Sequence, residues 1–120
     1  MNAKEVIGLI RFYKPALEEL QFRQALLADE ATMSYNAKWG GTIDWSREKW
    51  SNWAKRWLDT DEKVRFYRYI QNEEGEYVGE AAYRYDEEYG THVVSIIVKA
   101  DCRGKGYGRS ALKLLIKEAK

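Results

Sequence analysis

Residues 94–112 read VSIIVKADCRGKGYGRSAL, and this stretch decides the fold. It opens on apolar, partly β-branched residues, which predict a strand over His92–Lys99, the most apolar strand expected in the chain. Because its pattern does not alternate cleanly, we expect a central strand buried on both faces. A glycine-rich turn follows over Ala100–Gly108, and from Arg109 onward apolar residues recur at helical spacing.

The turn has the composition of an anion-binding site. Glycines let the backbone adopt positive φ and let N–H groups approach a ligand closely. The start of a helix leaves N–H groups without intrahelical partners and carries a partial positive charge, which favours phosphate. Arg103, Lys105 and Arg109 add full positive charges. Together these features favour a phosphate-bearing ligand over an ordinary strand-to-helix connection.

Several known motifs do not fit the turn. A Rossmann G-x-G-x-x-G pattern that starts at Gly104 meets Arg109 at its last position. A P-loop requires Ser or Thr after its lysine, and Gly106 follows Lys105 here. Lys105–Gly108 agrees with the first half of an RNP1 strand, but helix-forming residues follow in place of aromatic strand residues.

The pattern that remains, R-x-x-G-x-G between a strand and a helix, resembles the acetyl-CoA signature of the GNAT family, the Gcn5-related N-acetyltransferases. The run Arg103-Gly104-Lys105-Gly106-Tyr107-Gly108 agrees with that signature at every fixed position. The resemblance implies direct transfer of an acetyl group from acetyl-CoA to a primary amine within one ternary complex, where orientation supplies much of the rate. The specific motif is confined to residues 94–112, and the order of elements extends the resemblance over nearly the whole chain.

The resemblance also implies a cofactor site. Backbone amides of the turn would bind the pyrophosphate, and the preceding strand would pair with the pantetheine arm. That strand would offer a backbone N–H to the thioester carbonyl as an oxyanion hole. No metal is implied. The implied cofactor-binding residues are Ile97, Val98, Lys99, Arg103, Gly104, Lys105, Gly106, Tyr107, Gly108, Arg109 and Ser110.

The rest of the chain predicts elements in the order β-α-α-β-β-β-α. The expected segments before the signature are a strand at Val6–Tyr13, a helix at Ala16–Ala31, a loop at Thr32–Trp45, a helix at Ser46–Leu58 and a β-hairpin over 64–85. In the second helix, Trp50, Trp53 and Trp57 share one face, which we expect to pack in the core. We therefore expect an α+β fold, a mostly antiparallel sheet flanked by helices, like that of the acyl-CoA N-acyltransferases, in a single domain over residues 1–120.

The family continues beyond this last helix with further strands and another helix, whereas the sequence ends at Lys120. We therefore expect a truncated acetyltransferase whose strand at 93–98 has an unpaired edge. The family's general acid, a tyrosine that protonates the CoA thiolate, would lie in the missing part. These expectations predict weak or no activity for the isolated monomer. They also predict a homodimer in which the second copy covers the open edge.

Direct transfer requires a general base for the ammonium group of the acceptor. The candidates are Glu80, in the second strand of the hairpin, and His92, at the start of the next strand. Trp39 and Trp45 bracket a pair of glycines where the family builds its acceptor pocket, so we expect both to contact the acceptor. A covalent route through Cys102 is disfavoured, because an extended strand separates it from His92 by up to about 30 Å.

Composition sets the class of protein. The 120 residues are 45% hydrophobic and 32% charged, which is typical of a soluble globular domain. No apolar run has the length of a membrane span and no apolar signal segment follows the N-terminus, so a cytoplasmic location is expected. One cysteine and one histidine exclude a disulfide framework and a multi-histidine metal site.

Charge is unevenly distributed along the chain. The net charge of +1 combines −6 over residues 73–88 with +5 over residues 99–120. A basic cofactor turn beside an acidic hairpin predicts two ligands of opposite sign, and therefore a cationic amine acceptor, a small molecule or a peptide.

A second class of function uses the same residues. A non-catalytic nucleotide- or RNA-binding module would also place its ligand on the basic, glycine-rich turn. The helix expected after the turn, in place of an RNP1 strand, favours the acetyltransferase and argues against a nucleic-acid partner.

Overall fold

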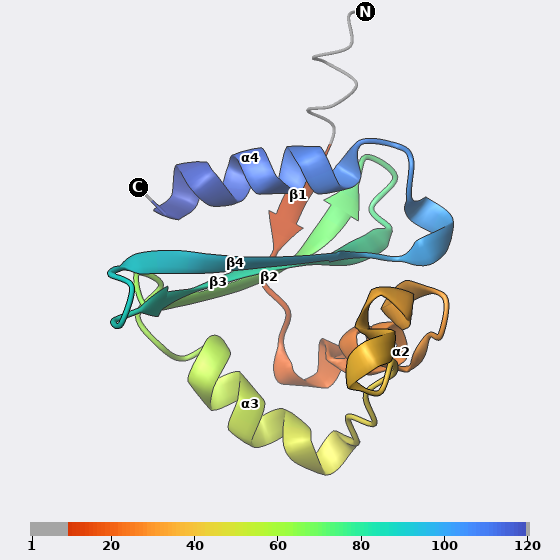
Figure 1. Ribbon diagram of the computed structural model, residues 1–120, viewed down its shortest axis with the longest axis horizontal. Helices are drawn as coiled ribbons and strands as arrows, with labels where there is room; N and C mark the ends of the chain where they lie inside the picture. Colours follow the sequence, from red (N-terminus) through yellow and green to blue (C-terminus); the bar gives the residue numbers. More distant parts are fainter. Residues whose placement is uncertain (1–9, 120) are drawn as a thin grey trace, which may run out of the picture.

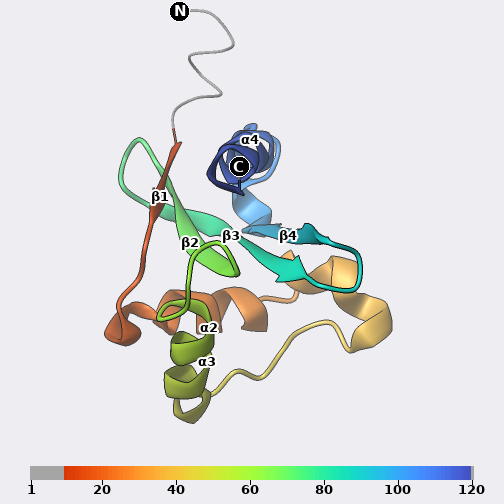
Figure 2. The same cartoon turned by 90° about the vertical axis from the view of Figure 1, so that its left-hand side faces the viewer.

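The computed structural model describes residues 10–119, which form a four-stranded antiparallel sheet with helices on both faces (Figure 1). The strands are β1 (Ile10–Tyr13), β2 (Arg65–Asn72), β3 (Tyr77–Asp86) and β4 (Thr91–Val98), in the spatial order β1-β2-β3-β4. Helix α4 (Tyr107–Ala119) covers one face, and α2 (Gln21–Ala28) and α3 (Trp50–Trp57) cover the other (Figure 2). The predicted α+β class is confirmed.

Short 3₁₀ helices modify the predicted boundaries. They are η1 (Leu17–Glu19), η2 (Thr32–Trp39), η3 (Arg47–Lys49) and η4 (Ala100–Cys102). The segment 32–39, predicted as loop, is therefore helical, and Gly40 ends it with a φ of 106°. The first residues of the strand predicted at Val6–Tyr13 lie outside the described residues. None of the helices in 10–119 combines the length and the apolar character needed to cross a membrane.

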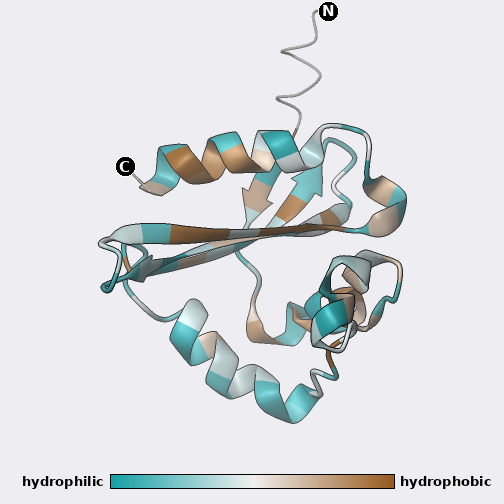
Figure 3. Ribbon diagram, in the orientation of Figure 1, coloured by the Kyte–Doolittle hydropathy of each residue, from teal (hydrophilic) through white to brown (hydrophobic). Residues whose placement is uncertain are grey.

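Two separate cores lie on the two faces of the sheet, because successive residues of a strand point to opposite faces. Tyr67 and Tyr69 of β2 pack on the side of α2 and α3, while Phe66 and Ile70 pack on the side of α4. Burying side chains of this size stabilises the fold by roughly 1.5–3 kcal/mol each. Figure 3 shows hydrophobic residues along β4, between the two helical layers.

The tryptophan face of α3 is buried, as predicted. Trp50 and Trp53 are 5% and 6% exposed, and the ring of Trp53 meets Tyr67 edge-on with 4.6 Å between centroids. The half-buried Trp57 packs against the same core, with the guanidinium of Arg65 5.2 Å from its ring centroid.

The prediction that β4 is a central strand is wrong for the part of the chain that the structure describes. β3 pairs along one edge of β4, from Gly79↔Val98 to Asp86↔Thr91, and within 10–119 no strand pairs along the other edge. Val93 and Val94 are consequently 39% and 45% exposed. These apolar side chains of β4 therefore form a surface that no other part of residues 10–119 fully covers. β2 and β3 occupy the centre of the sheet.

A buried ion pair joins α2 to the middle of β3. Nε of Arg23 lies 3.2 Å from Oε1 of Glu80, but without hydrogen-bond alignment, so the attraction is mainly electrostatic. The Tyr67 hydroxyl donates a hydrogen bond to the same oxygen. The guanidinium carbon of Arg23 also lies 4.5 and 4.6 Å from the ring centroids of Trp45 and Trp53.

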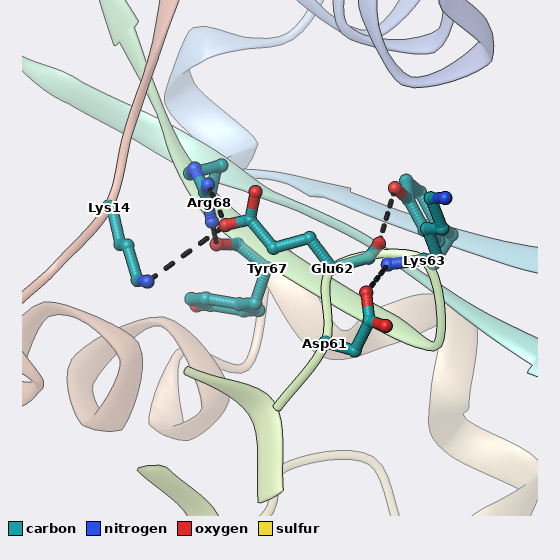
Figure 4. A network of polar contacts seen from close by, with 7 residues as sticks. Lys14, Asp61, Glu62, Lys63, Tyr67 and Arg68 are labelled. Atoms are coloured by element: carbon teal, nitrogen blue, oxygen red, sulfur yellow. Dashed lines mark hydrogen bonds and ion pairs between the residues drawn. The ribbon is translucent and has the colours of Figure 1, made fainter. Parts of the chain in front are cut away.

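The connection between α3 and β2 is held by Glu62 (Figure 4). Its carboxylate accepts a hydrogen bond from Arg68 and lies 3.9 Å from Nζ of Lys14. The hydrogen bond from Arg68 is the main cause that lowers the pKa of the Glu62 carboxyl. This contact anchors the start of β2 from the exposed side.

We expect strong coupling between Arg23 and Glu80 in a double-mutant cycle. Arg23→Met or Glu80→Gln alone removes the partner of a buried charge, which costs about 3–5 kcal/mol of unfolding free energy. The double variant should lose less than the sum of the single losses, with a coupling of about 1–3 kcal/mol by urea denaturation. Strictly additive losses would show that the pair contributes no interaction energy.

We also expect a pH-dependent contribution from Glu62. Because its folded pKa lies below the ordinary value of 4.5, the charged carboxylate stabilises the fold above about pH 4.5. That stabilisation is lost as pH falls through the folded pKa. With the side chain 50% exposed, Glu62→Gln should cost less than about 1 kcal/mol at pH 7. In urea denaturation the difference from wild type should shrink steadily as the pH falls below about 4.5. The exposed Glu87→Gln is the control, and a pH-independent difference would contradict the assignment.

Candidate functional site

A pocket of about 650 Å³ lies between the end of β4 and the start of α4. It is lined by Tyr35, Ile96, Ile97, Val98, Cys102, Arg103, Gly104, Gly106, Tyr107, Gly108, Arg109 and Leu112. Most of the predicted cofactor-binding residues are therefore brought together around one cavity. Lys99, Lys105 and Ser110 belong to the same turn but are outside this lining.

The glycines of the turn differ in what they provide. Gly104 and Gly106 both have a φ of 83°, which a residue with a side chain rarely adopts. Gly108 has no positive φ and lies in the first turn of α4. A Cβ at Gly108 would have ordinary contact with Cγ2 of Val98, at 3.6 Å. Gly104 and Gly106 thus shape the turn, whereas Gly108 leaves space at the pocket.

The start of α4 presents N–H groups at the pocket. The amide of Ser110 donates to the carbonyl of Gly106 at 3.1 Å, as the first hydrogen bond of the helix. The N–H groups of Tyr107, Gly108 and Arg109 precede that bond, so the helix itself provides no acceptor for them. All three residues line the pocket. With the positive end of the helix dipole, this arrangement can bind a phosphate group.

The strand side of the pocket presents backbone groups as well. The amide of Lys99 donates to the Val78 carbonyl at 2.8 Å, so Lys99 and Ile97 direct their N–H groups toward β3. N–H groups alternate in direction along a strand, and those of Ile96 and Val98 therefore point to the open edge. At Gly79 the two strands approach so closely that a Cβ would lie 2.2 Å from the Ile97 carbonyl oxygen.

Arg103 directs its guanidinium away from the turn. Nη2 donates to the Thr32 carbonyl at 2.7 Å, Nη1 to the Ala31 carbonyl at 3.5 Å, and Nε to the Val98 carbonyl at 3.1 Å. The backbone of Arg103 thus belongs to the cofactor turn, while its side chain contacts the segment that precedes and begins η2.

The two predicted base candidates lie apart. Glu80 is 4% exposed and pairs in register with Ile97, which lines the pocket. His92 lies at the opposite end of β4, where Nε2 is 2.8 Å from the Lys63 carbonyl oxygen. Its ring packs edge-on against Tyr83, with centroids 4.9 Å apart.

The two predicted acceptor tryptophans do not line the pocket. Trp39, at the end of η2, is 83% exposed, and Trp45 is 7% exposed within the core. The cation over the Trp45 ring is Arg23 of the same chain. The aromatic residue that does line the pocket from this region is Tyr35, which no motif or periodicity in the sequence indicated.

Two titratable side chains line the pocket with raised pKa values. Tyr35 is 63% exposed, and the partial desolvation that its remaining contacts cause, together with the charge of Glu80, raises the pKa of its hydroxyl, so it stays protonated at neutral pH. Burial also raises the pKa of the Cys102 thiol, which donates to Oδ1 of Asp101 at 3.3 Å. A protonated thiol is a weak nucleophile, which argues against an acyl-cysteine intermediate. Within residues 10–119, no cluster of three or more His, Cys, Asp or Glu side chains could hold a metal ion.

Comparison with solved structures shows the same fold in known acetyltransferases. One neighbour is a chimera of the Vibrio cholerae spermidine N-acetyltransferase SpeG and hSSAT, with a TM-score of 0.70 and 12% identity over 92% of this chain and 63% of that one. A putative acetyltransferase from Acinetobacter baylyi has a TM-score of 0.67 and 24% identity over 92% and 63%. A GCN5-related N-acetyltransferase from Kribbella flavida has a TM-score of 0.59 and 18% identity over 98% and 67%.

The chain spans 63% of the length of the first two of these structures. A search of curated proteins found no match. A family model, described as the acetyltransferase (GNAT) family, matches residues 15–120, which include every element from η1 to α4 and the whole pocket. The chain therefore belongs to the GNAT family of acetyltransferases.

Proposed function

We propose that the chain binds acetyl-CoA in the pocket between β4 and α4 and transfers the acetyl group directly to a primary amine. The observation that carries this proposal is the convergence of two sets of backbone donors on one cavity. The open edge of β4 at Val98 forms one side, and the first turn of α4 at Tyr107–Arg109 forms the other. Membership of an acetyltransferase family supports the same conclusion.

In this proposal the pyrophosphate, the pantetheine arm and the thioester of acetyl-CoA would each contact a different part of the pocket. The N–H groups that open α4 would hold the pyrophosphate, and the residues from Arg103 to Ser110 would surround it. The pantetheine arm would lie along Ile97–Lys99, in the manner of a strand added to a sheet edge. The Val98 N–H is the backbone donor directed at the thioester carbonyl, where it would stabilise developing negative charge.

Of the two base candidates, the geometry favours Glu80. It lies one strand away from the pocket-lining Ile97, whereas His92 lies at the far end of β4. Because the Glu80 carboxylate is buried and paired, we propose that a water molecule carries the ammonium proton to it. An unchanged pH profile of the rate in Glu80→Gln would contradict this assignment.

The acidic residues of the hairpin lie at two ends of the sheet. Glu73, Glu74 and Glu76 belong to the turn that precedes β3, near the end where Gly79 pairs with Val98. Asp86–Glu88 lie at the other end of β3. We propose that the first group attracts a cationic acceptor toward the pocket. The solved neighbour described as a spermidine N-acetyltransferase supports a polyamine as the first acceptor to test.

We also propose that the chain forms a homodimer. Exposed apolar residues surround the open edge of β4, and a second copy would cover them by strand pairing. These residues are Val93 and Val94 on the strand and Leu112 and Ile116 on α4, each at least 39% exposed.

We expect Gly108→Ala to weaken CoA binding without harming the fold. The Cβ has room beside Val98, and alanine is the better helix former, so stability should stay equal or rise by up to about 1 kcal/mol. The methyl group would fill the space in front of the helix amides, so the Kd for CoA should rise about tenfold or more, equivalent to about 1.4 kcal/mol. Calorimetry with CoA and urea denaturation measure the two effects.

Gly104→Ala gives the contrast in stability, because Gly104 needs its positive φ. That variant should lose about 1–2 kcal/mol of stability. A folded Gly108→Ala variant with wild-type affinity for CoA would overturn the site assignment.

We expect cationic amines to be acetylated in preference to neutral ones. Spermidine and a basic peptide should give a higher kcat/KM than an uncharged primary amine of similar size, and added salt should reduce the advantage. CoA-thiol release reports the rate. Exclusive acetylation of neutral or acidic acceptors would refute the electrostatic argument while leaving the cofactor site intact.

A further inference from the structure

The segment that carries Tyr35 is tied to the cofactor turn by Arg103. The guanidinium donates to the carbonyls of Ala31 and Thr32, at the start of η2, and to that of Val98, at the end of β4. All three acceptors are backbone atoms. The planar guanidinium presents several donors in fixed directions, which suits it to join two segments of backbone at once.

A second connection runs beside the first. The amide of Ala100 donates to Oγ1 of Thr32 at 3.0 Å, and the Thr32 hydroxyl donates to Asp29. Thr32 is fully buried, at 0% exposed. The hydrogen bond from Thr32 is also the main cause that lowers the pKa of the Asp29 carboxyl, which keeps it charged as an acceptor. η2 is thus joined to the turn by both a side chain and a backbone amide.

The geometry of η2 carries this connection to the pocket. A 3₁₀ helix has three residues per turn, so Tyr35 lies one turn after Thr32 on the same face of η2. Thr32 contacts Ala100, and Tyr35 lines the pocket together with Val98 and Gly108. The hydrogen bonds at Thr32 therefore set the position of Tyr35 over the cofactor turn.

We propose that Arg103 is a positioning residue that couples occupancy of the cofactor turn to the placement of η2 and of Tyr35 at the pocket. The inference rests on the proposed function, because CoA is the ligand that would fix the turn. Phosphates held by the amides of α4 would immobilise Gly104–Gly106, and the adjacent guanidinium would transmit that order to Ala31 and Thr32. The Arg103 side chain then holds the start of η2 in place and contributes little to binding the phosphates.

Hydrogen exchange of the amides in 31–41, with and without CoA, tests the coupling. In the wild type, CoA should slow exchange there by about tenfold. In Arg103→Ala that slowing should be lost, while the Kd for CoA changes by less than about threefold. Arg103→Lys should behave like Arg103→Ala, because an ammonium keeps the charge but lacks the planar fork. Lys113→Ala, an exposed position on α4 outside the pocket lining, is the control for loss of a positive charge.

Two substitutions of Thr32 separate loss of the coupling from a general loss of stability in η2. Thr32→Val removes the acceptor for the Ala100 amide at similar volume and should abolish the CoA effect on exchange. Thr32→Ser keeps the hydroxyl and should retain that effect.

The outcomes distinguish this inference from the proposed function. CoA binding that protects 31–41 equally in wild type and in Arg103→Ala would overturn the coupling alone. If the affinity for CoA is lost in Arg103→Ala but restored in Arg103→Lys, Arg103 is a phosphate ligand, and this result would also overturn the coupling. A wild-type chain that binds no CoA would overturn the proposed function and the coupling together.

Discussion

The fold depends on the neutralisation of one buried carboxylate. Glu80 lies in the middle of the sheet, where an unpaired charge would be strongly unfavourable. Arg23 of α2 pairs with Glu80, and its guanidinium carbon lies 4.5 and 4.6 Å from the ring centroids of Trp45 and Trp53. Through Arg23, the buried carboxylate is thus in contact with α2, with Trp45 before α3 and with Trp53 of α3, all on the same face of the sheet. The pairing with Glu80 also explains why Arg23 lies among the aromatic side chains of this core.

The pocket follows from how the two edges of β4 differ. Along its inner edge, β4 lies against β3, most closely at Gly79, where a side chain would collide with the Ile97 carbonyl. Along its outer edge, the N–H groups of Ile96 and Val98 face a space that no strand in 10–119 occupies. The close inner contact fixes the register, and the register decides which amides reach that space. The register that places Gly79 against the Ile97 carbonyl is thus the same register that directs the amides of Ile96 and Val98 to the outer edge of β4.

The sequence predicts what depends on local pattern and misses what depends on distant partners. Periodicity and turn residues were enough for the hairpin, the tryptophan face of α3 and the signature turn. Within residues 10–119 the prediction of a central β4 is wrong, because an apolar strand has the same sequence pattern whether or not a neighbouring strand pairs with its second edge. η2 was missed since a short 3₁₀ helix with mixed residues has no clear period. The Arg103 contacts join residues 71 and 72 positions apart, and Trp45 meets Arg23 through the fold, so neither role is visible in local sequence.

Each fixed position of R-x-x-G-x-G has a different physical task in this structure. Arg103 contributes a side chain that turns back onto two other segments, so its length and planar donors are needed. Gly106 contributes a positive φ, which redirects the chain into α4. Gly108 lies within a regular helix that would accept a side chain at this position. The missing side chain therefore matters only for a ligand that occupies the space. The side-chain contacts of Arg103, the positive φ of Gly106 and the missing side chain of Gly108 together shape the pocket, and Gly104, between the fixed positions, is held by its own positive φ.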